Sequence, residues 1–323
     1  MRKFIDRDAV LGLVILTLIV GVSVRFPGFA APRNLAEVLD DSSILILLAL
    51  GQMLVMLTRA VDLSVAANLA LSGMIAALFN RSFPEAGVVS AVALAVLSGA
   101  ALGAFNGVLI WLLRLPAIVV TLGTLSIYRG FIYVLSEGTW VNSNEMSPAF
   151  LHLVRMEFLG LTFVSWLAIL GGVLLWAALR FTNFGRNFFA AGGSPTAAAY
   201  AGIDAPRMQF FAFTIAGAIA GVCGYLWVSR FAVAYTDIAL GFELQVIAAC
   251  LIGGVSIAGG VGTVTGVVLG CLFLGVLMNT LPLVGISPFW QMAVNGLVIT
   301  IAAILNARTE KRGRRAILEA GAA

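Results

Sequence analysis

The stretch from residue 244 to residue 307 reads LQVIAACLIGGVSIAGGVGTVTGVVLGCLFLGVLMNTLPLVGISPFWQMAVNGLVITIAAILNA and contains no charged side chain. Because about 18 to 20 consecutive apolar residues are enough for a helix that crosses a bilayer, this stretch alone has room for three such helices. Transmembrane β-strands alternate apolar and polar residues in short segments, and this stretch shows long continuous apolar runs instead. It therefore predicts an α-helical membrane protein.

The composition of the whole chain leads to the same prediction. Of its 323 residues, 61% are hydrophobic and 11% are charged, and the mean hydropathy is +1.06, far outside the range of a soluble globular domain. We expect an all-α polytopic membrane protein that forms a single transmembrane domain over residues 1–323. Charges and turn residues divide it into about ten transmembrane helices, near residues 9–26, 42–58, 63–79, 86–113, 117–135, 161–179, 208–229, 243–258, 264–281 and 289–306.

Basic residues set the expected orientation. If the N-terminus is cytoplasmic, most arginines and both lysines lie in inner loops and tails, as the positive-inside rule requires. We therefore expect cytoplasmic N- and C-termini, a cytoplasmic loop at 181–207 and a basic cytoplasmic tail at 307–323. The apolar run 9–24 could also be read as a signal peptide, but a retained first helix is simpler because many spans follow. The outer side keeps only Arg25, Arg33, Arg81, Arg155 and Arg230.

The inner loop is long enough to contain one short helix. Ser194 can cap its N-terminus, Pro195 suits its first position, Thr196 to Ala201 can form about two turns, and Gly202 suits the residue after it. Such a short helix needs a surface to pack against. Two interpretations stay open, docking onto a soluble partner and an ordinary structured loop. The expected contact face consists of small residues and one large one: Ala197, Ala198, Ala201 and Tyr200.

Glycines at four-residue spacing predict close contacts between helices. Residues at this spacing lie on one face of a helix and let two backbones approach. Two glycine pairs, at 253–254 and 259–260, mark places where a helix can break, which at membrane depth borders a cavity or the protein interior. The spaced sets are Gly99, Gly103 and Gly107; Gly217 and Gly221; and Gly262, Gly266 and Gly270.

The sequence gives little support to an enzyme. It contains no HExxH, CxxC or GxSxG motif, and its one histidine, His152, falls in an outer loop. The three isolated cysteines lie in apolar runs and suggest neither a disulfide framework nor a metal site. Neither lysine, Lys3 or Lys311, belongs to a glycine-rich loop, so the chain lacks a phosphate-binding P-loop. The pI of about 9.2 follows from topology and does not call for nucleic acid.

Ion coupling also has little support, because few ionisable residues fall in or near the spans. The candidates are Asp62 at the end of a span and Arg129 in the fifth span. Asp62 could pair with Arg59 or cap the third span, and Arg129 lies near enough to the outer end to snorkel.

Four segments resemble a known family. They read RAVDLSVAANLALSGM at 59–74, VVTLGTLSIYRG at 119–130, FGR and AAGGSPTAAAYAGI within 184–203, and AACLIGGVSIAGGVGT at 248–263. In this order they resemble the permeases of sugar-type ABC importers, the ribose, xylose and rhamnose group, and the similarity extends from about residue 40 to 306. The chain departs from the family pattern at Arg59, Ala60 and Ala66, where glycine is usual.

The resemblance implies the other subunits of a transporter. A periplasmic sugar-binding protein would deliver the substrate, and two permease copies, identical or mixed, would form the path in the bacterial cytoplasmic (inner) membrane. A cytoplasmic ATPase subunit would bind ATP and Mg, so this chain needs no cofactor and no metal. The segments at 225–230 and 286–292 look most like rhamnose-type permeases. Another pentose or hexose, or a furanose-like signal molecule, stays open, as do a channel without ATP coupling and a structural subunit of an enzyme complex.

The resemblance also assigns candidate residues. The ATPase-coupling loop would use Phe184, Gly185, Arg186, Gly192, Gly193, Ala197, Ala198, Tyr200 and Gly202. The family motifs contain Asp62, Ser64, Arg129 and Gly130.

A path for a neutral polyol needs uncharged polar side chains that bind without holding the cargo. Hydrogen bonds between helices are the other explanation for such residues. At the outer side, the acids Glu137, Glu145, Glu157, Asp237 and Glu243 are expected to meet basic residues of the binding protein. The path candidates are Asn68, Asn106, Thr121 and Thr124, which lie in or near the family segments, and then Asn279, Gln291 and Asn295.

Overall fold

The computed structural model describes residues 2–287, 290, 291, 293, 294, 296–298, 300, 301 and 304, with the side chains described from residue 7 onward. Asn295 and the tail at 307–323 lie outside these residues. Within the described part, seven helices are long and apolar enough to cross a membrane, which confirms the all-α polytopic fold. They are α1 (Arg2–Arg25), α2 (Pro32–Leu57), α4 (Gly87–Leu113), α5 (Ala117–Ser136), α7 (Phe163–Phe181), α10 (Ala205–Phe231) and α12 (Val264–Leu283).

Two further expected spans are present as helices of a different character. Helix α3 (Val65–Ser82) is less apolar because Asn68, Asn80 and Arg81 lie within it. Helix α11 (Phe242–Ile252) has 11 residues, too few to cross a bilayer alone. The last expected span, 289–306, lies only partly among the described residues.

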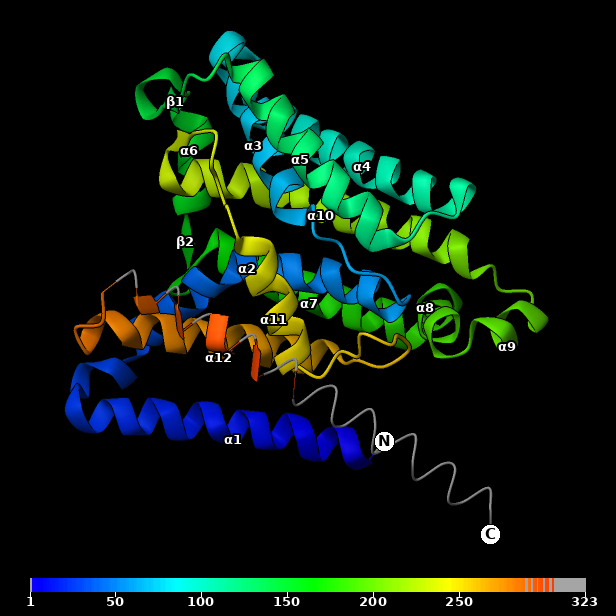
Figure 1. Ribbon diagram of the computed structural model, residues 1–323. Coiled ribbons are helices and arrows are strands. Elements are labelled where there is room, and N and C mark those ends of the chain that lie inside the picture. The colour runs from blue at the N-terminus through cyan, green and yellow to red at the C-terminus, as the bar shows by residue number, and fades with distance from the viewer. Residues whose placement is uncertain are drawn as a thin grey trace.

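Short elements gather at the two ends of the bundle. Figure 1 shows α8 and α9 at one end, here called the inner end, and α6, β1 and β2 at the opposite, outer end. The start of α1 also lies toward the inner end (Figure 1). Strands β1 and β4 pair antiparallel with Val141 opposite Ala234, and β2 pairs antiparallel with β3. The short elements are the 3₁₀ turns η1 (Pro27–Ala30), η2 (Pro84–Ala86) and η3 (Ser143–Glu145); the helices α6 (Pro148–Arg155), α8 (Asn183–Gly193) and α9 (Pro195–Tyr200); and the strands β1 (Val141–Asn142), β2 (Glu157–Phe158), β3 (Leu161–Thr162) and β4 (Val233–Ala234).

The predicted glycine contacts are confirmed between α4 and α10. A Cβ atom built on Gly99 would lie 2.4 Å from the carbonyl oxygen of Gly217, and one on Gly103 would lie 2.2 Å from that of Phe213. No larger side chain fits at these positions unless the helices separate. Helix α10 also packs against α2 and α3, so it occupies the centre of the bundle.

Helix α2 is the most deeply buried span. Its side chains from Ser42 to Leu57 are all buried, because α7, α10, α11 and α12 pack around it. The predicted helix break is confirmed on one side of it. Helix α11 ends at Ile252, and an irregular segment follows in which Gly254, Gly259 and Gly260 have positive φ. Residues 253–256 and Gly259 of this segment are buried in protein, where irregular backbone at membrane depth is tolerated.

Candidate functional site

Three backbone segments meet at the inner end and form what we call the inner junction (residues 58–60, 192–193 and 259–260). The Arg59 guanidinium donates from Nε to the Gly192 oxygen at 2.5 Å and from Nη2 to the Gly193 oxygen at 3.0 Å. The Gly260 N–H donates to the Leu57 oxygen at 2.9 Å. A Cβ atom on Gly192 would lie 1.7 Å from the Leu57 oxygen, so only glycine fits at this position without movement of the backbone.

The expected loop between the spans contains two helices rather than one. The hydroxyl of Thr182 accepts the Gly185 N–H at 2.9 Å and thereby starts α8, which the sequence did not predict. The second helix, α9, is the predicted one. The Ser194 hydroxyl accepts the Ala197 N–H at 3.3 Å, and Gly202 follows the helix with a φ of 77°. The capping residues read from the sequence are therefore confirmed.

The exposed face of α9 differs from the expected one. Tyr200 is 91% exposed and Ala197 is also exposed, whereas Ala198 is only 4% exposed. The expectation that Ala198 belongs to a contact face is wrong for this chain, because its side chain already packs inward. In α8, Arg186 stays exposed and bonds to Asn183 of the same helix. The Phe184 ring packs edge-on against the rings of Phe188 and Phe211, 5.0 Å and 5.4 Å away.

Asp62 of the family motif is buried in the turn between α2 and α3. Its Oδ1 accepts the backbone N–H of Ser64 at 2.8 Å and the Ser64 hydroxyl at 2.6 Å. In the described chain Asp62 forms no ion pair with Arg59, so it acts by holding the residue that precedes α3. Burial raises the pKa of the Asp62 carboxyl to about 6, although the two hydrogen bonds from Ser64 act in the opposite direction.

A buried polar network connects this turn to two spans. The Asn106 amide of α4 donates to the Ser64 hydroxyl at 2.8 Å, and the Tyr128 hydroxyl of α5 donates to Asn106 Oδ1 at 3.2 Å. The Tyr128 hydroxyl also lies 2.7 Å from the Leu102 oxygen. The structure thus brings together Asp62, Ser64 and Asn106, and it adds Tyr128, which the sequence reasoning missed.

The other three favoured path candidates are also buried and already bonded. Asn68 donates to the Gly99 oxygen at 3.0 Å and so bridges α3 to α4. The Thr121 hydroxyl reaches the Val61 oxygen at 3.3 Å, and that of Thr124 reaches the Val120 oxygen at 3.0 Å. These contacts are the ones expected of hydrogen bonds that hold the helices together. A role in the path stays a prediction for these residues.

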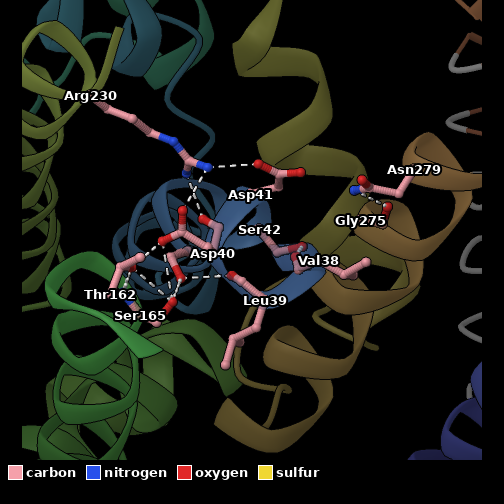
Figure 2. A network of polar contacts seen from close by, with 11 residues as sticks. Val38, Leu39, Asp40, Asp41, Ser42, Thr162, Ser165, Arg230, Gly275 and Asn279 are labelled. Atoms are coloured by element: carbon pink, nitrogen blue, oxygen red, sulfur yellow. Dashed lines mark hydrogen bonds and ion pairs between the residues drawn. The ribbon is translucent and has the colours of Figure 1, made fainter. Parts of the chain in front are cut away.

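The remaining path candidates lie elsewhere. Asn279 of α12 donates to the Gly275 oxygen one turn earlier at 3.1 Å, as Figure 2 shows. Gln291 donates to the Ile286 oxygen at 3.1 Å.

Gln52 is an unusual buried amide in the middle of α2. It is 0% exposed, and neither its Nε2 nor its Oε1 has a hydrogen-bond partner among the described residues. Most buried side-chain amides in native proteins have partners, so this one needs an explanation. The position of this glutamine within an apolar run could have marked it as a candidate, but the sequence analysis did not include it among the path residues.

Arg129 of α5 reaches the loop that follows β4 at the outer end. Its Nη1 donates to the Ile238 oxygen at 2.6 Å, so the half-buried guanidinium holds the loop before α11. Its neighbour Gly130 is exposed on α5, with no atom within 4 Å of a Cβ built there.

The outer end carries a second polar network that was not predicted (Figure 2). Arg230 at the end of α10 pairs through Nη2 with Asp40 at 2.7 Å and with Asp41 at 2.6 Å, both on α2. Thr162 donates to Asp40, and the Ser165 hydroxyl lies 3.3 Å from the same carboxylate oxygen. The network therefore joins α2, α7 and α10 at the outer end.

The five acidic residues expected to face a binding protein differ in their contacts and in their exposure. Glu157 lines an open pocket of about 810 Å³, together with Glu37 and Asp40. Glu145 lies 3.5 Å from Arg81, and Asp237 accepts a hydrogen bond from Tyr133. The outer surface thus presents acids, some of which are already engaged within the chain. Of the other two expected acids, Glu137 is exposed at the end of α5 and Glu243 is partly buried in the first turn of α11.

Comparison with known proteins identifies the family. Residues 34–303 match the family described as branched-chain amino acid transport system / permease component. The chain is 33% identical to the L-arabinose ABC transporter permease protein AraH of Azospirillum brasilense, over 98% of this chain and 91% of the relative. It is 35% identical to the autoinducer 2 import system permease protein LsrC of Salmonella typhi, over 95% of this chain and 88% of the relative. No solved structure matches the chain.

These relatives confirm the resemblance to sugar-type ABC importer permeases. Neither relative is named for rhamnose, so the rhamnose preference stays a prediction. The expected multi-pass location in the bacterial inner membrane agrees with the family and with the seven apolar helices. The chain therefore belongs to the family of permease components of branched-chain amino acid transport systems, in which it is similar to the sugar-type ABC permeases.

Proposed function

We propose that this chain is the membrane subunit of an ATP-driven importer that passes a sugar from a periplasmic binding protein to the cytoplasm. The observation that carries the proposal is the match to permeases of ABC transporters over nearly the whole chain. ATP and Mg would bind to a separate cytoplasmic ATPase subunit. A second permease copy, identical or related, would complete the path.

The inner end offers a surface for the ATPase. Helix α9 presents Tyr200, which is 91% exposed, next to the exposed Ala197. A large aromatic side chain with small neighbours is suited to insertion into a groove of a partner protein. Because α9 is short, docking would also stabilise it. This supports the coupling role that the resemblance implies for the loop.

The substrate class follows from the relatives, whose names refer to arabinose and autoinducer 2. We propose a neutral sugar, with rhamnose and arabinose as the pyranose candidates. A small furanose-like signal molecule is the second candidate because of the likeness to LsrC. Much of the specificity would lie in the binding protein, since the path must also release its cargo.

Reconstitution tests the proposal. The permease would be placed in vesicles with the ATPase and binding protein encoded beside it, and uptake of labelled arabinose, rhamnose, ribose and autoinducer 2 would be measured. We expect uptake that requires ATP and the binding protein. Uptake that is the same without ATP would establish a channel instead, and transport of an amino acid but no sugar would contradict the substrate class.

A further inference from the structure

Arg59 binds the end of a helix to which it does not belong. The last carbonyl groups of a helix have no partners within the helix and carry the negative end of its dipole. Helix α8 ends at Gly193, and the Arg59 guanidinium donates to the oxygens of Gly192 at 2.5 Å and Gly193 at 3.0 Å. Arg59 thus supplies two charge-assisted hydrogen bonds at the point where the α8–α9 segment meets the loop after α2.

The backbone of Arg59 is held in a conformation that favours glycine. Its φ is 65°, in the left-handed region, where a Cβ atom crowds the following carbonyl oxygen. A glycine at this position would adopt the same φ without that crowding. Strain of this kind persists only where the surrounding structure holds the backbone in place. The two bonds to the α8 carbonyls are what the arginine side chain contributes here.

The loop that carries Arg59 is connected to the interior of the bundle. Three residues further along, Asp62 holds Ser64 through two hydrogen bonds, and the Ser64 hydroxyl accepts the Asn106 amide at 2.8 Å. At its other end the loop is fixed to α10, because Gln209 donates to the Thr58 oxygen at 2.8 Å. A displacement of α8 that pulls on Arg59 therefore reaches α4 through contacts that are all direct.

We propose that Arg59 is the positioning residue that transmits movement of α8–α9 to the α2–α3 loop and through it to the membrane-spanning helices. This inference rests on the proposed function, in which an ATPase acts on α9. In this role Arg59 acts through the two loops and not by contact with ATP or the sugar. Its effect is on the number of sugar molecules imported for each ATP hydrolysed, which a residue that only supports folding does not change.

The test uses the complete transporter in vesicles and measures ATP hydrolysis and sugar uptake in the same sample. Arg59→Gly removes the guanidinium and leaves a residue that adopts the observed φ easily. We expect ATP hydrolysis per assembled complex to continue, and the ATP consumed per sugar imported to rise by about fivefold or more. Arg114→Gly is the matched control. Arg114 also has a positive φ of 53°, but its exposed side chain forms no hydrogen bond or ion pair with the described residues.

The outcomes separate the inference from the function. A wild-type ratio in Arg59→Gly, or the same rise in Arg114→Gly, would overturn the role of Arg59. Absence of ATP-dependent uptake in the wild-type complex would overturn the proposed function itself. If the transporter with Arg59→Gly does not assemble, the same ratio is measured for Arg59→Gln. This variant keeps a polar side chain but removes the positive charge and the fork of donors. A raised ratio in that variant supports the role, and a wild-type ratio contradicts it.

Discussion

Arg59 at the inner end and Arg230 at the outer end both join helices that are distant in sequence, and they do so by different chemistry. Arg59 donates to the carbonyl oxygens of Gly192 and Gly193. Arg230 pairs with the carboxylates of Asp40 and Asp41. The inner contact depends on how closely backbones approach, and the outer contact depends on side-chain charge.

This difference predicts different weaknesses at the two ends. Around Arg59, a single added carbon is enough to force segments apart, because backbone atoms already fill the space. Around Arg230, the shapes of the side chains matter less than the balance of one cation against two acids. The inner end should therefore be sensitive to volume, whereas the outer end should be sensitive to charge and to salt.

The largest effect is expected from Gly192→Ala. The new Cβ atom would lie 1.7 Å from the Leu57 oxygen and 2.7 Å from the Gly260 nitrogen, so α8 must move away from α2. We expect the free energy of unfolding to fall by about 3 kcal/mol or more, measured by thermal unfolding of the purified protein in detergent. Gly193→Ala is the control, since no atom lies within 4 Å of its Cβ position. Equal losses in the two variants would contradict the volume argument.

Charge removal at the outer end should have the next largest effect. Arg230→Gln leaves Asp40 and Asp41 without their cation, and the Arg230 and Asp40 side chains are only 20% and 18% exposed. We expect a loss of about 2 kcal/mol in the free energy of unfolding, between the values for exposed and buried pairs. The control Arg33→Gln removes an ion pair with Glu37 in which the arginine side chain is 93% exposed, and should change stability by less than about 0.5 kcal/mol.

The salt response tests the same contrast. The difference in unfolding temperature between wild type and Arg230→Gln should shrink at high salt, since salt screens the pair. The difference between wild type and Gly192→Ala should stay the same, because it arises from steric overlap. A salt-independent Arg230 effect would show that the guanidinium acts through its hydrogen bond to the Asp40 backbone oxygen instead.

Asp62 should give the inner end a pH dependence. Its folded-state pKa of about 6 is higher than its ordinary value of 3.8, so the folded protein binds this proton more tightly than the unfolded chain does. Protonation of Asp62 therefore stabilises the folded protein below about pH 4, and this stabilisation is lost as pH rises to about 6. The unfolding temperature of Asp62→Asn relative to wild type should rise by roughly 3 °C across this window and stay constant above it. If the unfolding temperatures of the two proteins change with pH in parallel, the pKa of the Asp62 carboxyl is not raised in the folded protein.

The smallest effect concerns Gln52, which lies on α2 between the two ends. Replacing its unpartnered amide by Gln52→Met removes two unsatisfied polar atoms at similar volume, and we expect stability to rise by about 1 kcal/mol. The matched variant Asn68→Leu removes an amide that is bonded to Gly99 and should lower stability by a similar amount. Lower stability in both variants would mean that Gln52 has a partner in solution. Reduced sugar uptake in a stable Gln52→Met protein would indicate that the amide meets the cargo.

Features set by short stretches of sequence were predictable. The caps of α9 follow from Ser194, Pro195 and Gly202, whose backbone preferences act locally. The contact between α4 and α10 follows from glycines at helical spacing. Helix α8 escaped prediction because its sequence, NFGRNFFAAGG, is rich in asparagine and glycine, which are poor helix formers. Its formation depends on Thr182 and on packing against α7 and α2.

Contacts between distant residues were not predictable from one sequence. Arg230 and Asp40 are 190 positions apart, and nothing local to either indicates the other. Ser64 and Asn106 are 42 positions apart, so their bond depends on how α4 lies against the loop. The prediction that Ala198 lies on an exposed contact face was wrong for the same reason. A six-residue helix that is mostly alanine has no strong apolar face to fix its rotation. The path candidates were chosen by polarity alone, which does not distinguish a cargo contact from a bond between helices.

The three isolated cysteines of the apolar runs make the protein well suited to spectroscopic labelling. Cys223, Cys250 and Cys271 are all 0% exposed. Water-soluble maleimides and nitroxide reagents should therefore leave the native protein unmodified, and in Arg114→Cys, at an exposed position, only the new cysteine should be labelled. If the proposed ATPase complex forms, the distance from such a probe to a tagged ATPase can be followed through the nucleotide cycle in a chain whose own cysteines are kept.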